Sequence, residues 1–366
     1  MRQCKQSSTI VIMAGGTGGH IFPALATASE LKSRGYNIHW LGTINSMESE
    51  LVPQYGFDIS FIPVTGLRGK KIGLLLQAPW RLIVSLLRAI KVLRQIRPIC
   101  VLGMGGYVTG PGGIAARLLN IPLVIHEQNA ITGLTNKLLS NIATRLLEAF
   151  PGTFLDQKAR TTKKIFTTGN PVRESIAEYS AYDVGTPLKL LVLGGSRGAV
   201  AINDVVPKVI ANCKGRVIIW HQTGKNNLAR SQQSYRELFG ERIDLYRVEP
   251  FINDMAKAYA WADVVLCRSG ALTVSELAAA GRPAILVPFP YAVDDHQTVN
   301  GRYLVDQGAA WMIKQQHLDE DALTTLLLEL SNDHTRLNAM AAAAKAAGQL
   351  KATKMVADHC LEVSHD

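Results

Sequence analysis

Two glycine-rich turns, each placed between an apolar strand and a helix, constrain the fold of this chain more than any other feature. The first follows residues 10–13 and reads Gly15-Gly16-Thr17-Gly18-Gly19-His20. The second follows residues 188–193 and reads Gly194-Gly195-Ser196-Arg197-Gly198. A strand that runs through such a turn into a helix opens a parallel α/β sheet, so two of them about 180 residues apart predict two doubly wound α/β domains.

Further apolar runs alternate with helical patterns along both halves of the chain. The runs that read as buried strands are residues 37–41, 99–102, 123–126, 217–221, 264–267 and 284–287. Strands that alternate with helices pair in parallel, so each half predicts a parallel sheet. Turn-rich sequence from Gly169 to Pro187 predicts the linker, and the cleft there is the expected place for a ligand.

Composition indicates a globular protein of a reducing compartment. Of the 366 residues, 47% are hydrophobic and 19% charged, which excludes a disordered chain. The five cysteines show no CxxC spacing, so neither a zinc site nor a redox motif is expected. The N-terminus lacks a signal-peptide pattern, and charged residues and Pro79 interrupt the best candidate span, residues 72–93. We therefore expect a cytoplasmic protein that does not cross the membrane.

The formal net charge of +10 is unevenly placed. No carboxylate occurs between Asp58 and Glu127, whereas the cations of this segment are Arg68, Lys70, Lys71, Arg81, Arg88, Lys91, Arg94, Arg97 and Arg117. Such a segment favours an anionic surface, either phospholipid or nucleic acid. Because the segment is rich in leucine and isoleucine rather than in stacking aromatics, nucleic acid is the weaker candidate.

The first glycine turn is expected to leave backbone amides open at a helix N-terminus, where anionic groups are stabilised. It lacks the GxGxxG spacing, and the next strand carries no acid for a ribose, so an NAD site is not expected. The GxxxxGK[ST] pattern of ATP-binding loops is also absent. Glycines that merely pack a tight turn are the alternative reading.

His20 directly follows this turn and is a candidate general base, because an imidazole titrates near neutrality. A histidine that only begins a helix or fills the core is the alternative. In the strand-end sequence His126-Glu127-Gln128-Asn129, we interpret His126 as positional. Asn129 is the candidate ligand contact, since strand ends border the binding crevice of such sheets.

In the second half, Cys267-Arg268-Ser269-Gly270-Ala271 follows an apolar strand and opens a helix. The amides of Ala271, Leu272 and Thr273 would face a diphosphate there. Glu276, one turn later, could accept hydrogen bonds from a ribose diol. Thr273 and Glu276 also fit a capping box, and both readings are compatible.

Two other chemistries compete for these motifs. The second glycine turn fits GxSxG, the nucleophile elbow of serine hydrolases, with Ser196 as nucleophile and with Asp263 or Asp294, followed by His296, as partners. Asp319-Glu320-Asp321 fits a DxD metal motif, but acids also belong at the start of a helix. We expect no metal and no cofactor.

Seven ordered motifs together resemble the MurG family of glycosyltransferases. They are GGTGGHIFP, GMGGYVTGPGG, HEQN, GNPVR, GGSRGA, FINDM and CRSGALTVSELAAAGRPAILVPFP, and they cover almost the whole chain. The resemblance implies the GT-B class, two Rossmann-like domains facing across a cleft, with the last helix returning to the first domain. The implied domains are residues 1–172 with the helix at 349–366, facing acceptor and membrane, and residues 173–348, binding the UDP-sugar.

By this resemblance the chain is an inverting enzyme of peptidoglycan synthesis that moves N-acetylglucosamine from UDP-N-acetylglucosamine to the 4-hydroxyl of undecaprenyl-diphospho-muramoyl-pentapeptide. His20 is the implied base. The implied substrate contacts are Thr17, Gly18, Gly19, Asn129, Arg173, Ser196, Ile252, Ala271, Leu272, Thr273, Val274, Ser275, Glu276 and Gln297. One departure concerns residues 290–297, where the loop is one residue longer than in the family and a glutamine pair is replaced by His296-Gln297.

A lipid-linked acceptor implies work at a membrane surface, and the carboxylate-free segment supplies candidate contacts. They are Lys70, Lys71, Leu74, Leu75, Trp80 and Arg81. Basic residues near anionic lipid contribute about 1 kcal/mol each, and neighbouring apolar side chains insert shallowly. The expected location is the cytoplasmic face of the inner membrane, with proteins of cell-wall synthesis as further candidate partners. A serine hydrolase and a non-catalytic binder of sugar nucleotides remain as alternatives.

Overall fold

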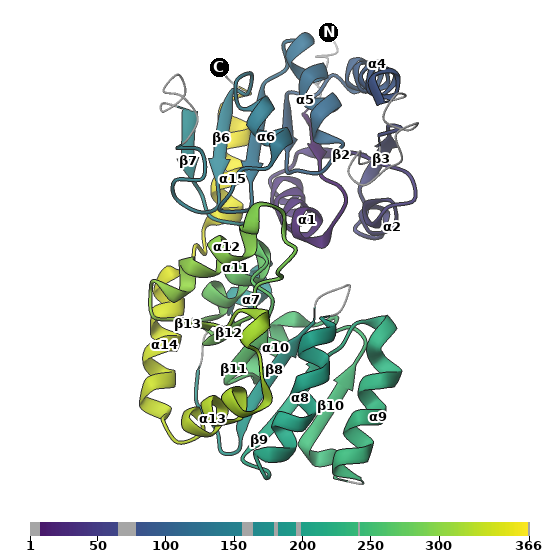
Figure 1. Cartoon of the computed structure of the whole chain (residues 1–366). Coiled ribbons are helices and arrows are strands. Elements are labelled where there is room, and N and C mark those ends of the chain that lie inside the picture. The colour runs from purple at the N-terminus through teal and green to yellow at the C-terminus, as the bar shows by residue number, and fades with distance from the viewer. Residues whose placement is uncertain are drawn as a thin grey trace. The chain divides into compact units, whose positions relative to one another are not determined.

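The computed structural model describes residues 8–64, 78–155, 164–178, 182–194, 199–240 and 242–364. The chain divides into two compact units, residues 1–172 with 351–366 and residues 173–350. Each unit holds one parallel sheet covered by helices (Figure 1). Nearly every strand expected from sequence is present within a residue or two, because buried strands in parallel sheets read as apolar runs.

The sheet of the first unit has the order β3-β2-β1-β4-β5-β6-β7, and all its neighbours pair in parallel. Its strands are β1 (Thr9–Met13), β2 (Asn37–Gly42), β3 (Asp58–Phe61), β4 (Cys100–Gly103), β5 (Leu123–Glu127), β6 (Arg145–Glu148) and β7 (Ile165–Thr167). Its helices are α1 (Gly18–Ser33), α2 (Met47–Gln54), α4 (Ala78–Ile96), α5 (Thr109–Leu118), α6 (Leu134–Leu139) and α15 (Ala352–Glu362).

Alternate side chains of β1 supply two separate cores. Ile10 and Ile12 pack on one face of the sheet with apolar residues of α1 and α15. Val11 and Met13 pack on the other face with residues of α4 and α5. Because successive side chains of a strand point to opposite faces, one five-residue run fills both cores.

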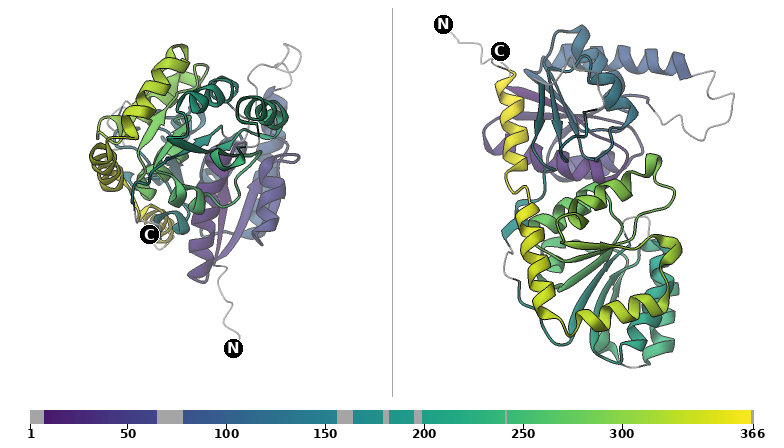
Figure 2. Two further views of the ribbon diagram at one scale, coloured as in Figure 1. Left: turned by 90° about the horizontal axis from the view of Figure 1, so that it is seen from below. Right: turned by 60° about the vertical axis from the view of Figure 1, so that its left-hand side comes forward.

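The last helix, α15, is a structural part of the first unit (Figure 2). Val356, Ala357 and Cys360 are buried in the core that α1 covers. Arg34 pairs with Asp358 at 2.5 Å, and Arg145 pairs with Glu362. Gly348 ends α14 (His334–Ala347) before this helix.

The sheet of the second unit has the order β10-β9-β8-β11-β12-β13, again entirely parallel. Its strands are β8 (Leu188–Leu193), β9 (Val217–Gln222), β10 (Tyr246–Glu249), β11 (Val264–Cys267), β12 (Ala284–Leu286) and β13 (Ala310–Met312). Besides α14, its helices are α7 (Glu174–Glu178), α8 (Val200–Asn212), α9 (Leu228–Phe239), α10 (Met255–Trp261), α11 (Ala271–Ala280), α12 (His296–Val305) and α13 (Glu320–Leu330). Short 3₁₀ turns cover residues 225–227, 243–245, 293–295 and 315–317.

Candidate functional site

Strand order places the glycine motifs at equivalent points of the two sheets. In both units the chain winds outward one way from the first strand and then returns to its other side, so the order reverses between β1 and β4 and between β8 and β11. Ligands of open α/β sheets bind outside the carboxyl ends of the strands at this reversal. The motifs that begin at Gly15, Gly103, Gly194 and Ser269 follow these four strands.

The first glycine turn forms the N-terminus of α1. Thr17 is the N-cap, with an extended backbone, and its carbonyl accepts the amides of His20 at 3.0 Å and Ile21 at 3.2 Å. Thr17 is exposed, while Gly18 and Gly19 are partly exposed. Since the first-turn amides of an α-helix have no partner within the helix, Gly18 and Gly19 offer donors to a ligand here.

One amide of this turn is not open, in contrast to the expectation from sequence. The amide of Gly16 donates to Oε2 of Glu48 at 3.2 Å. Glu48 belongs to α2 and is completely buried. Nothing in the sequence pattern pointed to Glu48, because its place depends on how α2 packs beside the turn.

His20 lies partly buried against two neighbouring backbones. Its Nδ1 is 3.3 Å from the carbonyl oxygen of Gly15, which can only accept a hydrogen bond. A hydrogen bond between these two atoms places the proton of the neutral ring on Nδ1 and leaves on Nε2 the lone pair that a general base needs. A Cβ on Gly105, whose φ is +97°, would lie 2.8 Å from Cδ2 of His20 and 3.0 Å from Nε2, so this ring position requires glycine.

The loop after β5 is organised around the buried carboxylate of Glu127. Its Oε1 accepts the backbone and side-chain amides of Asn129 at 3.0 and 3.2 Å, and its Oε2 accepts from Gly133 and Asn136 at 3.0 and 2.9 Å. These contacts fix the side-chain NH₂ of Asn129 toward Glu127 and turn its carbonyl oxygen the other way. His126 is fully buried and contacts the carbonyl of Gly169 at 2.9 Å, which agrees with a positional role.

The start of α11 has the geometry expected of a diphosphate cradle. Gly270 is the N-cap, so Ala271, Leu272 and Thr273 supply the first-turn amides.

The capping-box reading is wrong, because Thr273 lies within the helix and the carboxylate of Glu276 points elsewhere. Its Oε2 accepts from the hydroxyl of Tyr259 at 3.0 Å, and its Oε1 lies 3.5 Å from Arg173. Burial raises the pKa of Glu276, and the charge of Arg173 partly offsets this. Val274 is buried in the helix and Ser275 bonds back to the carbonyl of Ala271.

The loop after β12 holds Gln297 by its carbonyl oxygen. Oε1 of Gln297 accepts the amide of Phe289 at 2.9 Å, so its NH₂ group points away from that backbone. Arg268 fastens the base of the same loop by donating to the carbonyls of Val287 and Pro288 at 3.1 and 3.2 Å. The sequence assigned no role to Arg268 or Tyr259, since side-chain contacts of this kind leave no local pattern.

The remaining expected residues divide into those that the structure places and those it does not. Ile252 is buried and only 3% exposed, just after β10. Trp80 and Arg81 are exposed on α4. Ser196, Lys70, Lys71, Leu74 and Leu75 lie outside the described residues.

Two alternative chemistries lose support in the described part of the chain. Asp263 accepts the amide of Lys189 at 2.8 Å, at the amino end of β8, whereas Ser196 follows its carboxyl end. Asp263 is therefore no partner for a serine nucleophile. Asp319 caps α13 by accepting the amide of Ala322, which is the helix-start role. Within the ranges that the structure describes, no cluster of three or more metal-binding side chains occurs, and no helix is long and apolar enough to span a bilayer.

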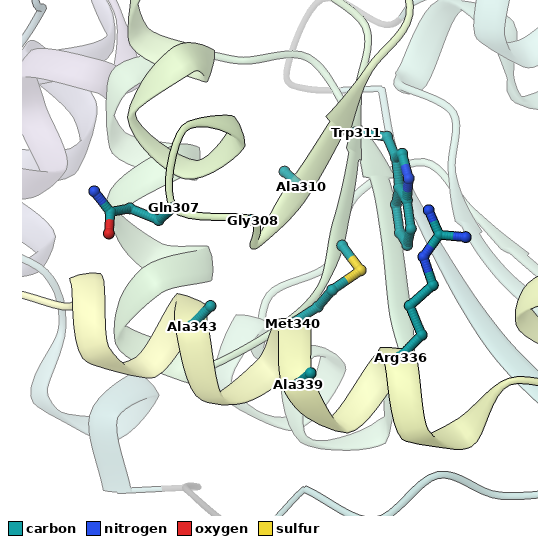
Figure 3. Close-up of a pocket in the computed structure, with 8 residues that line it drawn as sticks. All are labelled: Gln307, Gly308, Ala310, Trp311, Arg336, Ala339, Met340 and Ala343. Carbon is teal, nitrogen blue, oxygen red and sulfur yellow. The ribbon is translucent and has the colours of Figure 1, made fainter.

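A cavity of about 440 Å³ lies elsewhere in the second unit (Figure 3). The turn before β13, the strand itself and α14 line it, and the guanidinium of Arg336 stacks on Trp311 at 4.8 Å. Its lining includes the amino end of β13, whereas the glycine motifs follow carboxyl ends of parallel strands. The cavity therefore shares no residue with the candidate site.

Comparison with known proteins decides the family. Residues 10–148 match the glycosyltransferase family 28 N-terminal domain, and residues 189–357 match the C-terminal domain of the same family. The chain belongs to glycosyltransferase family 28. It is therefore a glycosyltransferase, and the serine-hydrolase and binding-protein readings are set aside.

Similar proteins also confirm the resemblance to MurG. The UDP-N-acetylglucosamine--N-acetylmuramyl-(pentapeptide) pyrophosphoryl-undecaprenol N-acetylglucosamine transferase of Ectopseudomonas mendocina is 51% identical over 358 residues, 97% of this chain and 98% of that protein. The protein of the same name from Shewanella amazonensis is 51% identical over 360 residues, 97% and 98% of the two chains. The crystal structure of Acinetobacter baumannii MurG matches with a TM-score of 0.80 at 38% identity, covering 97% of this chain and 99% of that one. The GT-B class with two parallel-sheet domains is thereby confirmed.

Proposed function

We propose that this family 28 enzyme transfers N-acetylglucosamine from UDP-N-acetylglucosamine to the 4-hydroxyl of undecaprenyl-diphospho-muramoyl-pentapeptide, with inversion at the anomeric carbon. The observation that carries the proposal is full-length similarity, at about half identity, to transferases that bear this name. The motifs at the reversal points of the two sheets supply groups suited to each part of the reaction.

The second unit holds the donor in this proposal. First-turn amides of Ala271, Leu272 and Thr273 stabilise the diphosphate, because a helix N-terminus carries open donors and a positive dipole end. Glu276 accepts the ribose hydroxyls, with Arg173 beside it. Gln297 donates to the sugar, since its carbonyl oxygen is already engaged. Ser196 and Ile252, with Val274 and Ser275 of the helix, complete the set of donor residues.

The first unit supplies the base and the acceptor contacts. Nε2 of His20 takes the proton of the acceptor 4-hydroxyl as that oxygen bonds to the anomeric carbon. The bond between the anomeric carbon and the diphosphate oxygen breaks, and its electron pair leaves with UDP. Thr17, Gly18 and Gly19 stabilise the charge that develops on the diphosphate, and Asn129 presents a carbonyl oxygen to a substrate hydroxyl.

Three neighbouring helices of the first unit supply a membrane surface. Exposed apolar residues are Trp80, Leu82, Ile83 and Leu87 on α4, Ile114 and Leu118 on α5, and Leu134 and Leu138 on α6. Exposed cations on these helices are Arg81, Arg88, Lys91, Arg94, Arg117 and Lys137. Between Asp58 and Asp156 the sequence has only two carboxylates, Glu127 and Glu148, and both are buried. An acid-free, partly apolar surface fits the cytoplasmic leaflet with its anionic lipids, beside the enzymes of cell-wall synthesis.

Transfer of labelled N-acetylglucosamine into a lipid-extractable muramoyl-pentapeptide acceptor tests the reaction. UDP-glucose and UDP-N-acetylgalactosamine serve as competing donors. Donor-selective transfer supports the proposal, whereas measurable binding of UDP-N-acetylglucosamine without transfer contradicts it.

Vesicle sedimentation with the triple variant Arg81→Glu, Arg88→Glu and Lys137→Glu tests the membrane surface. We expect binding to anionic vesicles to fall while transfer to a soluble acceptor analogue is kept. The matched control reverses three exposed cations of the second unit, Lys208→Glu, Lys214→Glu and Arg236→Glu. Equal losses of vesicle binding in the two variants would show that net charge, and not this surface, determines binding.

A further inference from the structure

Glu48 holds an unusual position beneath the first glycine turn. The residue is completely buried, although it carries a carboxylate. Its Oε1 accepts the amide and the hydroxyl of Thr43 at 3.2 and 2.6 Å, and its Oε2 accepts the amide of Gly16 at 3.2 Å. A Cβ on Gly15 would lie 2.7 Å from Oε1 of Glu48, which is too close for any side chain. The backbone of the turn therefore packs directly against the carboxylate.

A single peptide group links this carboxylate to His20. The amide of Gly16 donates to Glu48, and the carbonyl of Gly15, which belongs to the same peptide group, accepts from Nδ1 of His20 at 3.3 Å. Hydrogen bonds in series polarise one another, because a donor engaged by an anion increases the negative charge on its own carbonyl oxygen. The arrangement therefore resembles a carboxylate–histidine pair with one peptide group inserted between the partners.

We propose that Glu48 is a positioning residue for His20 and acts on it through the Gly15–Gly16 peptide group. The inference rests on the proposed role of His20 as the base. Glu48 keeps the proton on Nδ1, which leaves the lone pair on Nε2, and it stabilises the ring once Nε2 has taken the acceptor's proton. No proton passes along the peptide group.

The surroundings of His20 favour Glu48 as the source of this effect. Gly105 packs on His20 and Gly106 on the Gly15 carbonyl, and residues 103–106, Gly-Met-Gly-Gly, carry no charge. The first charged residue of α1 is Glu30, more than two turns further along the helix. The other elements that contact α1 carry further titratable groups. On β2 there is His39, which contacts Ser60, and on α2 there is Glu50, which is exposed. On α15 they are Lys354, Asp358, His359, the buried Cys360 and Glu362. Asp358, His359 and Glu362 contact Arg34 or Arg145. Tyr107 is exposed just after residues 103–106.

The wild-type protein alone gives the first test. In ¹⁵N-histidine-labelled protein, the signals of His20 are those that disappear in His20→Gln. We expect the neutral ring to be the Nδ1–H tautomer. The Nε2–H tautomer would overturn the proposal, whatever the behaviour of the variants.

Glu48→Gln and its matched control Glu50→Gln give the second test. Both remove one negative charge from α2, but only Glu48 contacts the Gly16 amide. In Glu48→Gln we expect the titration midpoint of His20 and the low-pH limb of kcat to move down by about half to one pH unit. We also expect kcat to fall roughly 10-fold, because a less basic imidazole takes the proton less readily, with KM for the donor changed less than about 2-fold. Glu50→Gln should match the wild type.

In Glu48→Gln, kcat could fall while the low-pH limb of kcat and the titration midpoint of His20 stay where they are in the wild type. Glu48 would then be a merely structural residue, and the proposal would be overturned. If Glu48→Gln does not fold, Glu48→Asp retains the charge, and the wild-type tautomer still decides. Failure of the proposed function is seen separately. In that case His20→Ala keeps near-normal turnover, while the coupling between Glu48 and His20 remains visible in the titration.

Discussion

The hydroxyl of Tyr259 donates a hydrogen bond to Oε2 of Glu276 at 3.0 Å, and both residues are buried. Burial raises the pKa of Glu276 because it disfavours the charged form, and it also raises the pKa of Tyr259 well above its ordinary value. Tyr259 therefore stays a neutral donor, and its hydrogen bond helps keep Glu276 ionised. An ionised Glu276 is the form that accepts ribose hydroxyls most strongly.

Tyr259→Phe is expected to weaken donor binding without disturbing the fold. Loss of a hydrogen bond to a charged group corresponds to roughly a 10-fold rise in KM for UDP-N-acetylglucosamine. The loss should grow as pH is lowered, because the pKa of Glu276 rises further and its charged form is depleted. Measurement of donor KM between pH 6 and 8 tests this. Tyr303→Phe is the control, since its hydroxyl bonds the carbonyl of Ala347 in the same unit. A Tyr259→Phe enzyme with unchanged KM across this range would contradict the role of Glu276.

Gly105→Ala is expected to reduce kcat by at least roughly 10-fold, because its Cβ would displace the ring of His20. Donor KM should change little, since the role proposed for the ring of His20 is toward the acceptor hydroxyl and not toward the donor. The control is Gly35→Ala, whose φ of +91° imposes similar backbone strain but whose Cβ would meet no atom within 4 Å. Kinetics and thermal unfolding of both variants separate strain from displacement. Similar kcat losses in the two would refute the steric argument.

The sequence predicted the parts of the fold that burial dictates. Continuous apolar runs located the central strands, and the glycine turns located both reversal points. It missed β3, β6, β7, β10 and β13, which have only three or four residues each. Four of these lie at sheet edges, where a strand is half exposed, and three of the four, β3, β7 and β10, carry polar residues. The fourth, β13, is apolar but has only three residues.

The candidate site was predictable only as far as its motifs are local. A glycine before a helix predicted that α11 begins at Ala271, and the helix does begin there. Glu48 contacts Gly16 across 32 residues, and Arg173 reaches Glu276 across 103. Such contacts depend on how whole elements pack. The tautomer of His20 and the orientations of the Asn129 and Gln297 amides depend on single neighbouring atoms, which no spacing pattern encodes.

Gln297→Glu is expected to weaken the contact with the donor sugar while leaving the loop in place. A glutamate can still accept the amide of Phe289 but cannot donate. We expect kcat/KM for UDP-N-acetylglucosamine to fall roughly 10-fold or more, because the side chain loses a donor and gains a charge near the diphosphate. His296→Gln, which restores the glutamine pair of the family, should stay within about 2-fold of the wild type. If Gln297→Glu matched the wild type, Gln297 would have no part in donor binding.

Two fully buried histidines predict how stability depends on pH. Burial lowers the pKa of His126 to about 4 and that of His221 to about 3, below the ordinary value of 6.5. At pH values between the native pKa and the ordinary pKa, the unfolded chain binds more protons than the native one. The free energy of unfolding therefore falls as pH is lowered from about 6.5. The expected loss from pH 7 to pH 5 is about 2 kcal/mol for each histidine.

Chemical denaturation of His126→Asn and His221→Asn at both pH values isolates these contributions. Each variant will be less stable at pH 7, because His126 contacts Gly169 and His221 contacts Tyr235 and Asn203. Each should nevertheless lose less stability on acidification than the wild type. His317→Asn, at an exposed position, is expected to keep the wild-type dependence. If His126→Asn and His221→Asn also kept the wild-type dependence of stability on pH, the two native histidines would already be protonated at pH 5. The hydrogen bond of a neutral His126 with Gly169 would then have to be revised.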